Sequence, residues 1–147
     1  MILLIFFELV NCFGKTWKTS FYIIKVFNLE YIAQAPKPIT SIAWWDKQTD
    51  EWAIVILDKT GEIKAGIQDG REIIPVSREN DLIEVFLSRM EAIEPDILVG
   101  YNSDYFDIPY IYYRIKNRLG ERTAKRLSPV RIVEERDKRW YCKWVIG

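Results

Sequence analysis

Apolar and polar residues follow two patterns along this chain, one typical of strands and the other typical of helices. Apolar positions at helical spacing predict helices at residues 77–94 and 108–119. Short runs rich in β-branched and aromatic residues predict strands at residues 21–30, 39–45, 52–57, 73–76 and 97–99. This order predicts an α/β fold with a mixed sheet, in which antiparallel strands are followed by a helix and a parallel return.

The predicted helices have recognisable start and stop signals. Ser77 fits the N-cap of the first. Pro109 lies in the first turn of the second, where its missing N–H would be unpaired in any case, and Gly120 fits a left-handed stop. Asp107 then lies between the end of strand 97–99 and the second helix, where open α/β sheets place their chemistry. From spacing alone, helix capping by Asp107 is the simpler interpretation.

The two ends of the chain are less regular. The opening MILLIFFELV predicts either a strand or a leader, because it is shorter than the roughly twenty apolar residues that a membrane helix needs. It also lacks the basic start and small-residue cleavage site of a signal peptide. Near the other end, residues 130–133 and 140–146 predict a hairpin around EERDKR. Because the opening apolar run is too short to span a membrane and lacks signal-peptide features, we expect no membrane association.

The composition supports one domain with a real core, since 49% of the residues are apolar and 14% are aromatic. Cys12 and Cys142 are isolated, and the chain has no histidine. These features argue against a zinc site, a disulfide framework and a Cys/His nucleophile. Thiols in a reducing cytoplasm are the expected state.

The net charge of zero hides an uneven distribution. Residues 114–147 carry 11 Lys and Arg against 4 Asp and Glu, whereas residues 1–113 carry 10 against 17. A basic end beside an acidic body suits a protein that holds metal ions in one place and a phosphate backbone in another. An ordinary solvated surface explains the same pattern equally well.

One stretch resembles a known family closely. PDILVGYNSDYFDIPYIYYR, residues 95–114, is similar to the second exonuclease motif of family B DNA polymerases, and RIKNRLGERTAKRLSPV after it resembles the replicative polymerases of tailed bacteriophages. The resemblance implies a ribonuclease-H-like fold and 3′→5′ proofreading of DNA. It also implies that Asp107 is a metal-binding carboxylate, and that Asn102 and Phe106 lie beside the single-stranded primer end.

Phe27-Asn28-Leu29-Glu30 resembles the first exonuclease motif, F-D-[IL]-E. On a strand, positions i and i+2 share a face, so two carboxylates at this spacing reach one metal pair. Glu30 matches the pattern, but Asn28 stands where the family has aspartate. An amide oxygen can coordinate a cation but brings no negative charge, which weakens binding of Mg²⁺ or Mn²⁺.

No third exonuclease motif is present, because Tyr141 has no aspartate four residues later. The resemblance thus leaves two of the family's four carboxylates, Glu30 and Asp107. We expect residues 21–147 to form a partial exonuclease domain after an unassigned leader at 1–20, with little activity alone. The alternative is a non-catalytic module that binds single-stranded DNA or complements a separately encoded polymerase fragment. A decayed or interrupted gene is a third interpretation.

Binding of a single-stranded primer end would use stacking and charge together. Phe106 and Tyr101 are the expected stacking residues, with Tyr105 as a further candidate. The basic segment that begins at Arg114 would contact phosphates. Within that segment, the residues expected to do so are Arg122, Lys125 and Arg126.

Overall fold

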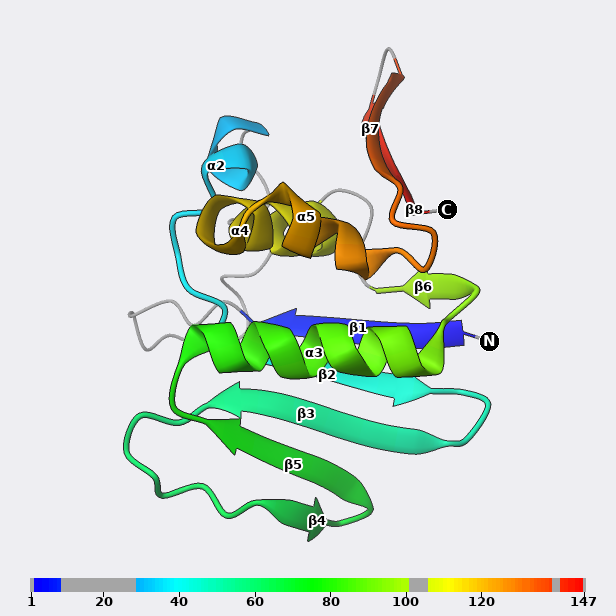
Figure 1. The fold of residues 1–147 in the computed structure, drawn as a ribbon. Coiled ribbons are helices and arrows are strands. Elements are labelled where there is room, and N and C mark those ends of the chain that lie inside the picture. Colours follow the sequence, from blue (N-terminus) through cyan, green and yellow to red (C-terminus); the bar gives the residue numbers. More distant parts are fainter. Residues whose placement is uncertain (1, 9–28, 101–105, 139–140, 147) are drawn as a thin grey trace, which may run out of the picture.

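The computed structural model describes residues 2–8, 29–100, 106–138 and 141–146. The strands in this part of the chain form a six-stranded sheet and a separate two-stranded hairpin. Figure 1 shows the helices beside the larger sheet. The sheet strands are β1 (Ile2–Glu8), β2 (Ser41–Asp46), β3 (Glu51–Leu57), β4 (Gly66–Gln68), β5 (Arg71–Val76) and β6 (Ile97–Val99). The helices are α2 (Leu29–Gln34), α3 (Glu79–Ile93), α4 (Ile108–Leu119), α5 (Glu121–Ala124) and the 3₁₀ turn η3 (Lys125–Leu127). The hairpin consists of β7 (Val133–Lys138) and β8 (Tyr141–Ile146).

The six strands follow the order β4-β5-β3-β2-β1-β6 and form a mixed sheet, as predicted. The pairs β1–β2 and β2–β3 are antiparallel, whereas β6 returns parallel to β1 and β5 lies parallel to β3. The opening residues, which the sequence left open between strand and leader, form strand β1. This strand lies inside the sheet, between β2 and β6.

The core lies between one face of the sheet and the helices. Along β2, buried and half-buried residues alternate, so Ile42 and Trp44 point to the same side. On that side Trp44 lies 6.2 Å from Phe86 of α3, measured between ring centroids. Ile111 and Ile115 of α4 are fully buried in the same cluster. In Figure 1, α3 crosses in front of the strands on this face.

The strand at 97–99 and the helix at 108–119 have the predicted bounds. Ser77 as a helix cap was wrong: α3 is preceded by Arg78, whose side chain makes no capping hydrogen bond. Its guanidinium instead pairs with Asp81 at 2.8 Å. Gly120 ends α4 with a positive φ of 88°, as its place in the sequence indicated, but its ψ of 161° lies outside the left-handed helical region.

The predicted strand at 21–30 is wrong at its carboxyl end, because Leu29 and Glu30 begin the helix α2; residues 21–28 lie outside the described part. Contacts with α4 explain the helix, since they satisfy carbonyls that a short helix leaves unpaired. Asn117 donates hydrogen bonds to the carbonyls of Ala33 and Gln34, and Arg114 donates one to that of Ala35. Local helix propensity does not include such contacts between distant residues, so it does not predict this helix.

A hairpin near the end of the chain was predicted correctly, but its first strand and its turn were misplaced, because residues 130–132 are not in a strand and β7 begins at Val133. The polar residues 134–138 belong to β7 rather than to the turn. They pair with β8 in register, with Glu134 opposite Val145 and Lys138 opposite Tyr141. In Figure 1 the hairpin projects beyond β6, apart from the larger sheet.

Candidate functional site

Asp107 lies at the point where the chain passes into α4. Phe106 and Asp107 form a short π-helical turn before Ile108, and Asp107 has helical dihedral angles, with φ −61° and ψ −57°. Asp107 occupies the N-cap position of α4, as the helix-cap interpretation predicts, but its side chain makes no capping hydrogen bond. The residue is only 8% exposed. A carboxylate is thus held close to the protein interior at the mouth of the helix.

Aromatic rings connect this turn to α2. The ring of Phe106 stacks on that of Tyr110 at 5.3 Å, and Tyr110 lies 6.2 Å from Tyr31 of α2. The Tyr110 hydroxyl donates to the carbonyl of Lys37 and accepts from its N–H. Burial raises the pKa of Tyr110 to about 12. These contacts fix α2 and the start of α4 relative to each other.

The two matched carboxylates therefore lie on elements that pack together, but in different surroundings. Glu30 directly precedes Tyr31, which contacts α4 through Tyr110. Glu30 is exposed and accepts a hydrogen bond from Gln34 at 3.1 Å, whereas Asp107 is buried. Asn28, Tyr101 and Asn102 lie outside the described residues. The strand-based i, i+2 geometry expected for Asn28 and Glu30 does not apply, because Glu30 is helical.

A metal site is not assembled by the residues that the structure describes. Within 2–8, 29–100, 106–138 and 141–146, no group of three or more Asp, Glu, His or Cys side chains is placed to hold a cation. A two-metal site needs several carboxylates to offset the charge of two divalent ions. One buried and one exposed carboxylate do not fit that requirement, so no catalytic step follows from them alone.

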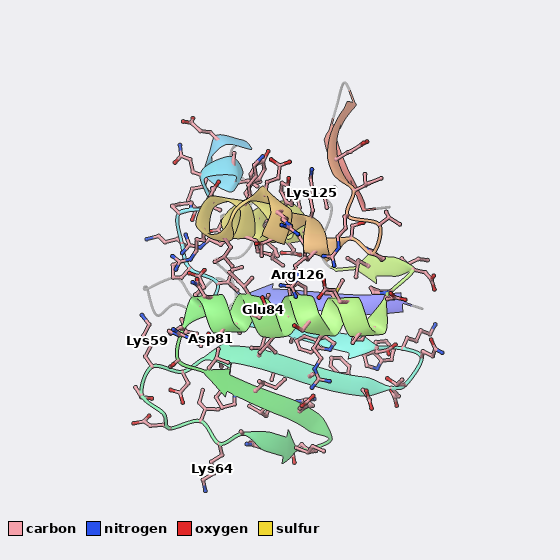
Figure 2. The ribbon with its side chains drawn as sticks, viewed as in Figure 1. Lys59, Lys64, Asp81, Glu84, Lys125 and Arg126 are labelled. Atoms are coloured by element: carbon pink, nitrogen blue, oxygen red, sulfur yellow. The ribbon has the colours of Figure 1, made fainter. Side chains whose placement is uncertain are left out.

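The predicted phosphate-binding cations differ in their surroundings. The Arg126 guanidinium binds Glu84 at 2.7 Å and Glu91 at 2.8 Å, and Figure 2 shows it pointing from η3 toward α3. Lys125 pairs with Glu121 at 3.1 Å. Arg122 is exposed, and no ion pair joins it to the described part of the chain. Of the three, Arg122 is the residue whose charge is most available to a ligand.

Ion pairs between helices account for much of the uneven charge, and the sequence analysis missed them. Glu79 of α3 binds Arg114 at 2.8 Å and Arg118 at 3.3 Å. Glu91 binds Arg126 and also Arg131, the latter at 2.7 Å. The hydrogen bond from Arg126 lowers the pKa of Glu91 to about 2. The acidic helix α3 and the basic segment from α4 onward are thus complementary to each other.

Comparison with known proteins identifies the fold. Residues 19–138 match the family model described as DNA polymerase family B, exonuclease domain. The chain belongs to this family, and its mixed sheet with flanking helices is the ribonuclease-H-like architecture of that domain. Divalent metal use is general in the family. None of the described helices is long and apolar enough to cross a membrane.

The relatives are much longer than this chain. It is 37% identical over 120 residues to the DNA-directed DNA polymerase of Escherichia phage RB69, covering 67% of this chain and 13% of that protein. It is 32% identical over 112 residues to that of Enterobacteria phage T4, covering 75% of this chain and 11% of that protein. A DNA polymerase of Archaeoglobus fulgidus is 40% identical over 52 residues, covering 35% of this chain and 7% of its own length. The chain corresponds to a small part of each.

Proposed function

We propose that this chain is the proofreading portion of a family B DNA polymerase, which binds single-stranded primer 3′ ends during replication of a phage in the host cytoplasm. The arrangement that carries the proposal is the matched motif itself. Its described residues include strand β6 and helix α4, with Asp107 buried at the start of the helix and Phe106 beside it. The phage relatives support a role in DNA synthesis.

In this proposal, Asp107 and Glu30 occupy the catalytic, metal-binding positions of the family, which need further carboxylates to hold Mg²⁺ or Mn²⁺, and Asn28 is a degenerate catalytic position. Asn102, Tyr101 and Phe106 contact the primer end. Arg122 supplies the available phosphate contact, and Lys125 and Arg126 contribute mainly through the field of the basic segment, since both are paired with carboxylates.

We expect little or no hydrolysis by the isolated chain, because the described residues do not form a metal site. The test is digestion of a 5′-labelled single-stranded oligonucleotide with Mg²⁺ or Mn²⁺. The control variant is Asp107→Asn, which keeps the size of this 8%-exposed side chain. Strong digestion that the control abolishes would show that a complete metal site forms in this chain.

DNA binding is tested separately by fluorescence anisotropy with a labelled dT20 oligonucleotide. Neutralising phosphates releases counterions, so affinity should fall with salt at a slope of about −0.7 per contacted phosphate. Arg122→Glu should make this slope shallower. The matched control is Lys59→Glu, an equal charge change at an exposed lysine on the loop after β3, remote from Lys125 in Figure 2. Equal effects of both variants would reduce Arg122 to a general charge contribution.

The Phe106→Ala variant tests whether a base of the single-stranded DNA stacks on the Phe106 ring. Stacking of a base on an aromatic side chain is worth roughly 1–3 kcal/mol, so affinity should fall at every salt concentration. Phe106 also packs on Tyr110, so its loss could unfold the domain. The binding result therefore counts only if the thermal unfolding midpoint of Phe106→Ala lies above the temperature of the assay. No measurable binding by the unmodified chain at low salt would contradict the proposed function as a DNA-binding module. The alternative, complementation of a separately encoded polymerase fragment, would then be the remaining role.

A further inference from the structure

One face of α4 binds the backbone at the end of α2 and just after it. Tyr110, Arg114 and Asn117 are spaced four and three residues apart, so their side chains lie on the same side of the helix. Their donors bind five consecutive carbonyls at 2.8–3.3 Å: Asn117 those of Ala33 and Gln34, Arg114 those of Ala35 and Pro36, and Tyr110 that of Lys37. Residues 33–37 therefore run along α4, and Figure 1 shows α2 beside this helix.

The segment after α2 depends on these side chains because it has few backbone partners of its own. Pro36 and Pro38 have no N–H to donate. The Ala35 N–H closes the last turn of α2, and the Lys37 N–H donates to the Tyr110 hydroxyl at 2.9 Å. Ala35 is fully buried with a φ of 40°, a left-handed conformation that is costly for a residue with a Cβ and persists only where surrounding contacts hold it. Contacts with α4 therefore determine where this segment lies.

Arg114 is the best-held of the three side chains. Its Nε and Nη2 bind the two carboxylate oxygens of Glu79, both at 2.8 Å, while its Nη1 binds the carbonyls of residues 35 and 36. The Arg114 side chain is 12% exposed. All three guanidinium nitrogens thus bind protein groups in a planar arrangement that a lysine cannot reproduce. Arg114 begins the segment expected to contact phosphates, but its own guanidinium orients a backbone.

The same helix connects the two carboxylates of the candidate site. Asp107 is buried at the start of α4, three residues before Tyr110. Glu30 lies in the first turn of α2, and Asn117 binds the carbonyls of the last turn of that helix. Helix α4 therefore carries one carboxylate at its start and binds the helix that carries the other.

We infer that Tyr110, Arg114 and Asn117 are positioning residues, which set the place of Glu30 relative to Asp107. The inference rests on the proposed function, because that function assigns the two carboxylates to one site. It gives two residues of the matched stretch 95–114 a role besides that of its aspartate. Tyr110 and Arg114 align the segment that carries the first motif.

The test measures the place of α2 by spin-label distances in the isolated chain, after Cys12→Ser and Cys142→Ser. One label is attached to Glu30→Cys. The other is attached to Lys59→Cys, on an exposed loop whose N–H groups bind the Asp58 carboxylate. We expect a narrow distance distribution. Its width should roughly double in Asn117→Asp and in Arg114→Lys, since a helix of six residues is not stable without its tertiary partners.

The controls separate positioning from a general loss of stability. Arg118→Lys is the matched variant, because Arg118 also binds Glu79, at 3.3 Å, but its other hydrogen bonds go to Asn80 of α3. It should leave the width unchanged. A second label pair, Lys59→Cys with Lys116→Cys, reports on α4 itself and should keep its distance in every variant. Asn117 is exposed, so Asn117→Asp carries the test if Arg114→Lys does not fold.

Hydrogen exchange provides a measurement without labels. Amides of residues 29–37 should exchange roughly tenfold faster in Arg114→Lys, because hydrogen bonds from a charged donor are lost and this segment opens locally. Amides of β2 and β3 should keep their exchange rates. Equal acceleration in the sheet would mean that Arg114 stabilises the whole domain rather than positioning α2, and would overturn the inference.

Two results of the distance measurement would also overturn it. One is an unchanged distribution between the labels at residues 30 and 59 in both Asn117→Asp and Arg114→Lys. The other is equal broadening by Arg118→Lys or of the reference pair. Neither measurement involves DNA or a metal ion. The DNA-binding test on Arg122 can therefore fail while the positioning of α2 holds, and the reverse.

Discussion

Glu79 is the residue whose loss should disturb the described fold most through a polar contact. It lies in the first turn of α3, and its carboxylate accepts hydrogen bonds from the Arg114 guanidinium and from the backbone N–H of Ile39, all at 2.8 Å. Arg118 adds a contact at 3.3 Å. The side chains of Glu79 and Arg114 are only 7% and 12% exposed. One carboxylate thus joins α3, α4 and the segment that leads into β2.

Glu79→Gln keeps the shape and removes the charge. Breaking a buried ion pair from one side costs about 3–5 kcal/mol, and because glutamine retains one acceptor we expect about 3 kcal/mol. For a domain of this size, that is a fall of roughly 10 °C in Tm. Glu84→Gln is the matched control, since its side chain is 56% exposed and should cost no more than about 1 kcal/mol.

The assay is urea unfolding followed by tryptophan fluorescence, repeated as a function of pH. The hydrogen bond from Arg114 and that from the Ile39 N–H lower the pKa of Glu79 despite its burial. The stabilisation is therefore present above the ordinary glutamate pKa of 4.5 and is lost as the pH falls below it. In Glu79→Gln, the free energy of unfolding should not show this loss at acid pH. A free energy of unfolding within about 0.5 kcal/mol of the original would refute the reasoning.

Three further changes test other parts of the fold. Glu91→Gln should lower stability at neutral pH by about 1–2 kcal/mol after allowance for solvent screening, and should remove the loss that the original chain shows between pH 4.5 and about 2, measured by urea unfolding. Tyr110→Phe removes both hydrogen bonds to Lys37 and should cost about 1–2 kcal/mol; in the original chain, ultraviolet titration should show one tyrosine ionising near pH 12, and stability should fall above pH 10 as the unfolded state ionises first. Gly120→Ala should cost about 1–2 kcal/mol in thermal unfolding through backbone strain at φ 88°, since no atom lies within 4 Å of the added Cβ.

The sequence predicted those parts of the fold that depend on local pattern. Helix α4 and strand β6 were placed at their observed bounds because their apolar spacing, Pro109 and Gly120 agree with one another. Helix α2 was missed because it depends on contacts with α4. Asn117 lies 84 residues after Ala33, and Arg114 lies 79 residues after Ala35, to whose carbonyls they donate hydrogen bonds. The ion pairs of α3 were missed for the same reason: the composition records the charges but not which helices face each other.

The candidate site was predicted less completely than the fold. The motif led to Asp107 at the mouth of α4, but not to its burial or to its lack of a capping hydrogen bond. The strand geometry assumed for Glu30 was wrong, and Arg126, expected to face phosphate, binds Glu84 and Glu91. Side-chain partners across elements decide whether a charge is available, and a single sequence does not specify them.

The position of β1 inside the sheet has a consequence for biosynthesis. Its Ile2 pairs with Ile97, so one of its two partners is made 95 residues later. At about 5–20 residues per second, the strand waits on the order of 5–20 s for that partner. During this time ILLIFFE is an apolar segment of high β-propensity with an unpaired edge, the kind of sequence that promotes aggregation. Long-range strand pairing also slows folding. The yield of folded protein should therefore fall when translation is slowed, and it should rise with a chaperone that shields the newly made strand β1.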